Sequence, residues 1–278
     1  MPTVKQVIAN RSNGSCSTAI VAGLSIQIIA EMNLLIPNIL VNFEDLNVSA
    51  ASPPVNLFLQ PAAKEALRRA IRKRGTTLNI TSAYRTVAQQ HLLYSWFKLG
   101  GQCAPPRAAK PGLSNHEDGL ALDTPDFQAW ISALENEGWD WFGNADSVHF
   151  TYRGSGVRDD IGDIGVKAFQ QLWNKNNPND QITVDGGFGP QTAAKLDMSP
   201  AEGFAMARLL KLTTPNLQGE DVRKVQQALV NAGFLSANQI NSSYDDDTKS
   251  AVEKFQDQKG LSQDGVVGPQ TRRLLGIS

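Results

Sequence analysis

Residues that can bind a metal ion are concentrated in two short segments of this sequence. The first is Ser114-Asn-His116-Glu-Asp-Gly119-Leu-Ala121-Leu-Asp123, and the second is Asp146-Ser-Val-His149-Phe-Thr-Tyr152. A tight turn at Gly119 would bring His116 and Asp123 together from a loop and a strand end. His149, in another strand-like segment, can supply a third ligand. Two imidazoles and one carboxylate suit Zn²⁺ and leave its fourth position for water, as in catalytic zinc sites.

Asp146 lies three residues before His149 and is the candidate general base. It could accept a proton from an attacking water, whose pKa zinc lowers to about 7, and pass it to a leaving amine. Taken singly, Asp123 could cap the turn that follows it, and Asp146 could belong to a polar loop. The remaining histidine, His91, has no acidic or histidine neighbour on its helical stretch, and we interpret it as structural.

Composition narrows the class of protein that can hold these residues. The chain has 278 residues, which favours two domains, and its 41% apolar and 19% charged residues are typical of a soluble globular protein. With 26 basic and 27 acidic residues the net charge is −1, which argues against nucleic acid as a partner. One basic cluster, from Arg68 to Arg74, has the spacing of the solvated face and C-terminal end of a helix.

Two cysteines, Cys16 and Cys103, allow one disulfide or two free thiols. The apolar stretch from Thr18 to Ala30 contains Ser25 and Gln27, precedes Glu31 and lacks a cleavage site, so we expect no standard export signal. We expect instead a helix with Ser25 as N-cap and Ile26, Ile29 and Met32 on its buried side. No unbroken apolar run reaches about 18 residues, and we predict no membrane insertion.

The elements that must position the candidate ligands form a mixed pattern. The sequence predicts helices within 53–74, which opens with Pro53-Pro54 and stops at Gly75, and over 87–99 and 127–136. It predicts strands at 78–82, 119–123 and 148–152. For Trp130, Trp139 and Trp141 we expect buried packing, although they could line a groove. Without regular alternation of strands and helices, this pattern indicates an α+β domain ending near residue 155.

Beyond about residue 160 helical spacing dominates and a repeat occurs. Asp185-Gly-Gly-Phe-Gly-Pro-Gln-Thr192 returns as Asp264-Gly-Val-Val-Gly-Pro-Gln-Thr271, each after a helix with a Phe-Gln pair. This half resembles the peptidoglycan-binding domain of cell-wall hydrolases, most fully over 219–276. Residues 163–197 match only the later part of the pattern, with a longer insertion before the turn. A helical packing unit without a ligand is the alternative.

The pattern Ser-x-His-x-x-Gly-x-Ala-x-Asp at 114–123 resembles the signature of zinc D-alanyl-D-alanine carboxypeptidases. Vancomycin-resistance-type D,D-peptidases and phage L-alanyl-D-glutamate peptidases share it. Ser82-Ala-Tyr-Arg85 with Gln90, and Asp146-Ser-Val-His149-Phe150, match further segments, so the resemblance covers residues 55–152. It implies a Hedgehog/D,D-peptidase-like zinc domain over 1–155, a partial repeat and linker over 156–204, and a small all-helical peptidoglycan-binding domain over 205–278.

The same resemblance implies a role for each site residue. His116, Asp123 and His149 would bind zinc, Asp146 would act as general base and then acid, and Arg85 would hold the substrate carbonyl as charge develops on its oxygen. The implied substrate contacts are Ser114, Gln90 and Tyr84. Many relatives have glutamate at the position of Asp146, whose side chain is one methylene shorter.

These inferences predict a zinc metallopeptidase that cleaves peptidoglycan stem peptides and is held on the wall by its C-terminal half. D-alanyl-D-alanine carboxypeptidase is the first choice, and a lytic L-alanyl-D-glutamate or D,D-endopeptidase is the alternative, as an endolysin or a delivered effector. A non-catalytic wall-binding protein is a third reading, which the combination of Arg85 and Asp146 disfavours. We expect a monomer that acts in the periplasm or outside the cell. There the Cys16–Cys103 disulfide becomes plausible, although the export route is not evident.

Overall fold

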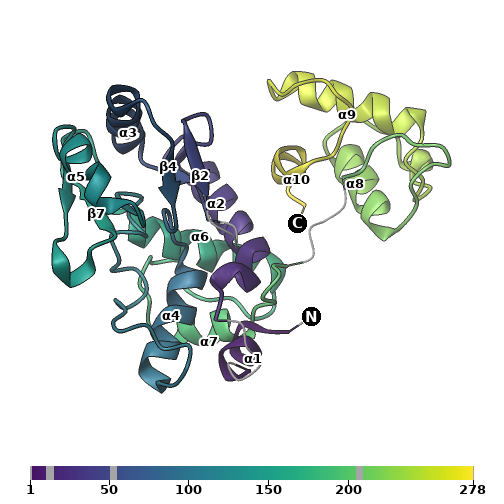
Figure 1. Ribbon diagram of the computed structural model, residues 1–278. Coiled ribbons are helices and arrows are strands. Elements are labelled where there is room, and N and C mark those ends of the chain that lie inside the picture. The colour runs from purple at the N-terminus through teal and green to yellow at the C-terminus, as the bar shows by residue number, and fades with distance from the viewer. Residues whose placement is uncertain (1, 11–15, 51–54, 205–208, 278) are drawn as a thin grey trace. The chain divides into compact units, whose positions relative to one another are not determined.

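The computed structural model describes residues 2–10, 16–50, 55–204 and 209–277, so Pro53 and Pro54 lie outside the described residues. The chain divides into two compact units, Met1–Phe204 and Ala205–Ser278, with separate hydrophobic cores. In the first unit helices surround short strands, whereas the second is helical (Figure 1). The predicted α+β fold with a small helical C-terminal domain is therefore confirmed.

Short strands in the first unit form three small sheets. β1 (Val41–Asn42) pairs antiparallel with β3 (Phe58–Leu59), and β2 (Val48–Ala50) pairs parallel with β4 (Leu78–Ile80). The third sheet has the order β5 (Ala121–Asp123), β7 (His149–Tyr152), β6 (Trp139–Trp141), and its pairs are antiparallel. Its register sets Asp123 opposite His149, so two predicted ligands lie side by side.

Helices α3 (Pro61–Arg74), α4 (Val87–Leu99) and α5 (Phe127–Glu135) confirm the three helices predicted between residues 53 and 136. α3 ends at Gly75, whose φ of 71° is a left-handed conformation that glycine adopts readily. α4 begins with a capping box between Thr86 and Gln89. The basic cluster lies on the solvated side of α3, where Arg69 and Lys73 both pair with Glu137.

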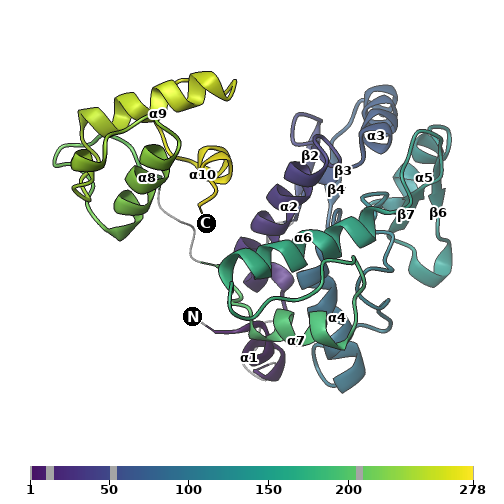
Figure 2. The same ribbon diagram turned by 180° about the vertical axis from the view of Figure 1, so that it is seen from behind.

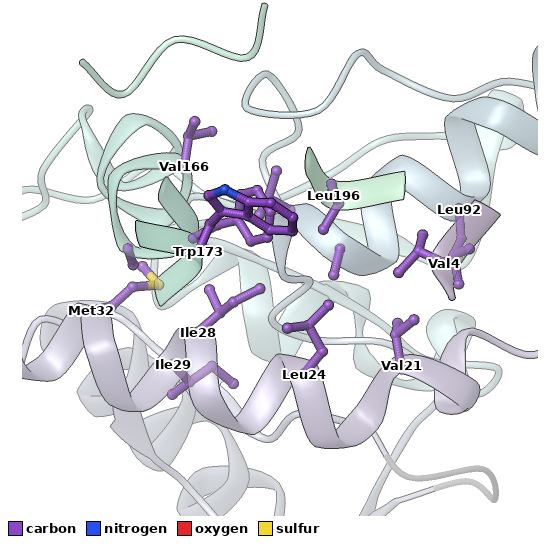
Figure 3. Close-up of a cluster of buried hydrophobic side chains, with 14 of the residues drawn as sticks. Val4, Val21, Leu24, Ile28, Ile29, Met32, Leu92, Val166, Trp173 and Leu196 are labelled. Atoms are coloured by element: carbon purple, nitrogen blue, oxygen red, sulfur yellow. The ribbon is translucent and has the colours of Figure 1, made fainter. Parts of the chain in front are cut away.

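The N-terminal apolar segment differs in detail from its prediction. A 3₁₀ turn (Thr18–Val21) leads into α2 (Ala22–Leu35), so Ser25 lies inside the helix, where its hydroxyl hydrogen-bonds Thr86 Oγ1 at 2.8 Å. Ile26 is exposed. The buried residues include Leu24, Ile28, Ile29 and Met32, and Figure 3 shows Leu24 and Ile28 on the side of α2 that faces Trp173. The prediction began the helix one turn too late and was wrong for Ile26, whereas Ile29 and Met32 are buried as predicted.

Residues Thr18–Leu35 form the one helix, among the described residues, that is long and apolar enough to cross a membrane. A core helix of a soluble protein and a signal sequence meet the same criterion. Here α2 packs along α6 (Ile161–Asn176), as Figure 2 shows. Buried Glu31 on α2 also pairs with Lys175 at 2.5 Å. Both contacts make α2 an integral part of the first unit's core.

Segment 156–204 folds within the first unit. α6 packs against α2, and α7 (Pro190–Met198) packs against α1 (Val4–Ala9). The second unit contains α8 (Glu220–Asn231), a 3₁₀ turn (Ala237–Gln239), α9 (Asp246–Gln258) and α10 (Pro269–Leu275). Its core is centred on the apolar faces of α8 and α9.

A buried glutamine organises each of three helix–turn segments, one in the first unit and two in the second. The amide nitrogen of Gln170 on α6 donates to Asp185 Oδ1, to the Gly187 carbonyl and to Thr192 Oγ1. Its oxygen accepts the N–H of Gly186. The same bonds join Gln226 to Asn241, Ser243, Thr248 and the Ser242 N–H, and join Gln256 to Asp264, Val266, Thr271 and the Gly265 N–H.

These bonds correct the predicted correspondence between segment 163–197 and the C-terminal unit. Gln170 is separated from its aspartate by 15 residues and from its threonine by 22, and Gln226 has the same two separations from Asn241 and Thr248. Gln256 has separations of only 8 and 15. Segment α6–α7 therefore corresponds to the complete first half of the C-terminal unit rather than to a late portion with an insertion.

Cys16 and Cys103 form a disulfide with a Cα–Cα distance of 5.0 Å. It joins the segment that precedes α2 to the loop between α4 and the histidine motif, which runs over residues 100–112. The composition alone left a disulfide and two free thiols equally open, and the structure contains the disulfide.

Candidate metal centre and active site

Three of the predicted site residues converge on one point. His116 Nε2, His149 Nδ1 and Asp123 Oδ1 are separated by 3.2 Å between the imidazoles and by 2.9 and 3.4 Å to the carboxylate. For metal–ligand distances of about 2.0–2.1 Å, a tetrahedral ion places its ligand atoms about 3.3 Å apart. The residues form the one His/Asp cluster within 4.8 Å found among the described residues, and the donor set and spacing fit zinc.

Hydrogen bonds to the other ring nitrogens orient both imidazoles, and that of His116 selects its tautomer. His116 Nδ1 lies 2.7 Å from the carbonyl oxygen of Ala83, which only accepts, so the proton is on Nδ1 and Nε2 is free to bind a cation. His149 Nε2 lies 3.0 Å from Thr151 Oγ1 and 3.1 Å from Asn115 Nδ2, and metal binding at Nδ1 would place the proton on Nε2, where Thr151 Oγ1 can accept it. Such partners orient metal-binding imidazoles in known sites.

The electrostatic environment favours the protonation states of His116 and Asp123 that bind a cation. Burial, and next the charge of Arg85, lowers the pKa of His116. Burial alone would raise the pKa of Asp123, but its interactions with His116 and His149 hold that pKa well below its usual range. Neutral imidazole and ionised carboxylate are the forms that bind a metal ion.

The segment from Ser82 to Arg85 is hydrogen-bonded to both ligand-bearing segments. Asp123 N–H donates to the Ser82 carbonyl at 2.8 Å, and Arg85 N–H donates to the His116 carbonyl at 3.1 Å. The Arg85 guanidinium donates to Gln90 Oε1 at 3.0 Å and to Ser82 Oγ at 3.2 Å. Burial lowers the pKa of Arg85, opposed by the charges of nearby acidic residues, and arginine remains a cation under these conditions.

Gln90 and Tyr84 occupy different places from those expected of substrate contacts. Gln90 is buried, accepts from Arg85 and donates to the Ala109 carbonyl at 2.8 Å, so it positions the arginine and the 100–112 loop. Tyr84 is 2% exposed, and its hydroxyl donates to Met32 Sδ at 3.0 Å inside the core. Its aromatic ring was compatible with either location, and core packing against α2 determined the outcome.

Ser114 lies in a loop organised by a residue that the sequence analysis did not single out. Buried Glu117 accepts the backbone N–H groups of Gly112, at 2.9 and 3.0 Å, and of Ser114, at 3.2 Å. Burial raises the pKa of Glu117 to about 8, although these N–H bonds oppose the shift. The residue stands inside the motif but at a variable position, so only the folded loop reveals its role.

Asp146 ends a 3₁₀ turn (Asn144–Asp146) three residues before the ligand His149. Its side chain is 38% exposed, and its Oδ2 accepts from Arg107 Nη2 at 3.1 Å. The Arg107 guanidinium also covers the ring of Phe142 at 4.7 Å, and that ring meets His149 edge-on at 5.7 Å. Sequence reasoning missed Arg107 and Phe142 because neither belongs to a motif.

Outside the site, His91 agrees with its structural interpretation. It is buried on α4, its Nε2 lies 2.8 Å from Asp197 Oδ1 on α7, and its ring packs against Phe188. Trp130 and Trp139 are buried as expected, and Trp141 stacks on Phe127.

Comparison with known families matches two parts of the chain. Residues 59–154 match VanY, described as D-alanyl-D-alanine carboxypeptidase, and residues 218–275 match a peptidoglycan binding domain. The chain therefore combines a segment similar to VanY with a segment similar to a peptidoglycan binding domain. The resemblance inferred from the sequence motifs is thus confirmed, and the VanY match contains all three converging ligands.

Two curated proteins of Bacillus licheniformis are also similar. A "probable N-acetylmuramoyl-L-alanine amidase" is 29% identical over 132 residues, which cover 43% of this chain and 36% of that protein. The N-acetylmuramoyl-L-alanine amidase CwlL is 32% identical over 127 residues, which cover 40% of this chain and 34% of that protein. This chain spans about a third of the length of these relatives.

Proposed function

We propose that this protein is a zinc-dependent peptidoglycan hydrolase that removes the terminal D-alanine from D-alanyl-D-alanine stem peptides. The observation that carries the proposal is the convergence of His116, Asp123 and His149 inside the VanY-matching segment. The peptidoglycan-binding match in the second unit supports the same polymer as substrate. Because these two supports come from separate units, they are independent of each other.

Zinc held by the three ligands would polarise the scissile carbonyl and bring the pKa of a bound water to about 7. Asp146 then serves as the base that takes the proton of the attacking water and returns it to the leaving amine. Arg85 stabilises the negative charge that develops on the carbonyl oxygen. Because Gln90 and Ser82 hold the guanidinium of Arg85, it needs no rearrangement to act.

The second unit would act as a tether. A module that binds the wall raises the local concentration of stem peptides around the first unit without altering its chemistry. The substrate lies outside the cytoplasmic membrane, so we place the activity in the periplasm or outside the cell. The disulfide supports that location, because such bonds persist in oxidising compartments.

Mass spectrometry of defined muropeptides tests the proposal. Zinc-loaded protein should remove one alanine from a pentapeptide stem, a chelator should stop the reaction, and added zinc should restore it. The His116→Ala variant is the inactive control. Cleavage inside the stem would identify an endopeptidase, and release of the whole stem from muramic acid would identify an amidase like the named relatives. No cleavage by zinc-loaded protein that still binds sacculi would indicate a wall-binding protein.

A further inference from the structure

An arginine outside every motif lies next to the proposed general base. Arg107 Nη2 donates to Asp146 Oδ2 at 3.1 Å, and the Arg107 side chain is 53% exposed. Its guanidinium also covers the Phe142 ring at 4.7 Å, and this ring contacts the ligand His149 edge-on. A solvent-facing cation therefore lies at the rim of the metal centre.

The two arginines of the site differ in how firmly they are held. The Arg85 guanidinium donates to two neutral partners, Gln90 Oε1 and Ser82 Oγ, and is largely buried. Arg107 is held by one partly exposed ion pair and one aromatic face. Exposed ion pairs contribute little stability, so another carboxylate can replace Asp146 on Arg107 at small cost.

The backbone that carries Arg107 is anchored on both sides. Cys103 is bonded to Cys16, and the Ala109 carbonyl accepts from Gln90 Nε2 at 2.8 Å. Gln90 in turn holds Arg85, so the same side chain fixes the position of both arginines. The anchored loop keeps the guanidinium near the metal centre while its side chain is free to exchange partners.

We propose that Arg107 binds the free terminal carboxylate of the substrate and leaves Asp146 when it does so. A guanidinium pairs with a carboxylate through two parallel hydrogen bonds, which suits a peptide α-carboxylate. The exchange makes Asp146 available as a base only when a chain end is bound. This inference rests on the proposed function and deepens it: Arg107 selects substrates that end in a carboxylate.

The test compares a peptide ending in D-Ala-D-Ala with its C-terminal amide. For the full-length protein, kcat/KM should be higher for the acid. Arg107→Ala should lower kcat/KM for the acid by about 10- to 100-fold, mainly through KM, as expected for loss of a hydrogen bond to a charged group. The amide should be cleaved faster than by the unsubstituted protein, because Asp146 is then no longer paired with Arg107, so the acid preference disappears. Arg107→Lys should restore part of it, because it keeps the charge without the planar fork.

Arg153→Ala is the matched control. It removes another exposed arginine of the same unit, paired with Asp140, and should leave the acid-to-amide ratio unchanged. Zinc content and melting temperature establish that each variant is folded. An Arg107→Ala variant that retains the acid preference, or loses both activities equally, overturns the role of Arg107 alone. A full-length zinc-loaded protein that cleaves neither peptide contradicts the proposed function and this inference together.

Discussion

Segment α6–α7 of the first unit and segment α8–α9 of the second share one hydrogen-bonding pattern but differ in their surroundings. α6 buries nine of its 16 residues, whereas α8 buries four of its 12. α6 lies against α2, and its start meets the histidine motif, where Asp118 accepts the Gly162 N–H at 3.3 Å. A Cβ on Gly162 would lie 2.6 Å from the Gly112 carbonyl oxygen, so the approach requires glycine.

This difference shows that the repeat determines a local hydrogen-bonding pattern but not the function of the segment that contains it. In both segments a buried glutamine fixes a turn against a threonine. In the first unit the additional apolar residues of α6, such as Ile161 and Trp173, make the copy part of that unit's hydrophobic core. We infer that chemistry belongs to the first unit and wall binding to the second.

The largest effect that separates the two units is expected at Asp146. Asp146→Asn should lower kcat by about 10²–10⁴-fold, because it removes the proton acceptor. Zinc content and binding to sacculi should not change, and Asp146→Glu should retain part of the activity. Kinetics on a soluble muropeptide, metal analysis and a sacculus pull-down make the measurement. Loss of zinc from Asp146→Asn would assign this residue to the metal ligands instead.

Removal of residues 205–278 should have the opposite effect to Asp146→Asn, because it removes wall binding and keeps turnover. Turnover of a small soluble muropeptide should remain the same, because the first unit has its own core. Release of product from intact sacculi should fall by about 100-fold, since the tether no longer concentrates the enzyme on its polymer. Equal loss on both substrates would show that the second unit contributes to the chemistry.

Matched substitutions of the two glutamines should affect different units. Gln170→Ala and Gln226→Ala each leave buried polar groups without partners, which costs about 1–3 kcal/mol of unfolding free energy. Differential scanning calorimetry should show a lower first-unit transition and weaker zinc retention for Gln170→Ala. For Gln226→Ala only the second-unit transition should move. A shift of both transitions in either variant would contradict the separation of the units.

The smallest expected effect concerns the residues whose N–H groups donate to the three buried glutamines. Gly186, Ser242 and Gly265 have φ values of 82°, 61° and 62°, so the serine alone adopts a left-handed conformation with a side chain. Ser242→Gly should stabilise the second unit by about 0.5–1 kcal/mol, because it removes that strain. Gly186→Ala should destabilise the first unit, since its Cβ would lie 3.0 Å from the Asp163 carbonyl oxygen. Denaturant titration measures both, and a destabilising Ser242→Gly would refute the comparison of the turns.

Sequence patterns predicted the elements that carry the motifs better than those that surround them. The strands ending at Asp123 and beginning at His149 were found because alternation and motif coincide there. β1, β2, β3 and β6 have only two or three residues each and contain none of the motif residues, and they were not predicted. The start of α2 was misplaced because Ser25, a common N-cap residue, is buried inside the helix.

The same contrast applies within the candidate site. The three ligands were predicted by type and spacing, whereas Glu117 acts through the backbone N–H groups of its own loop and Arg107 through the distant side chain of Asp146. Tyr84 was predicted as a substrate contact, but its hydroxyl lies in the core because α2, far away in sequence, packs over it. Tertiary contacts of this kind leave no periodic signal in the chain.

Zinc binding by metal-free protein tests the central claim most directly. Titration calorimetry with metal analysis should give one zinc ion per chain, together with recovery of muropeptide cleavage at the same stoichiometry. His116→Ala, Asp123→Ala and His149→Ala should each lose the tightly bound ion, while His91→Ala should keep it. Failure of the full-length protein to bind zinc would contradict the assignment of the metal centre. Zinc binding by the three ligand variants that is as tight as that of the unsubstituted protein would contradict it too.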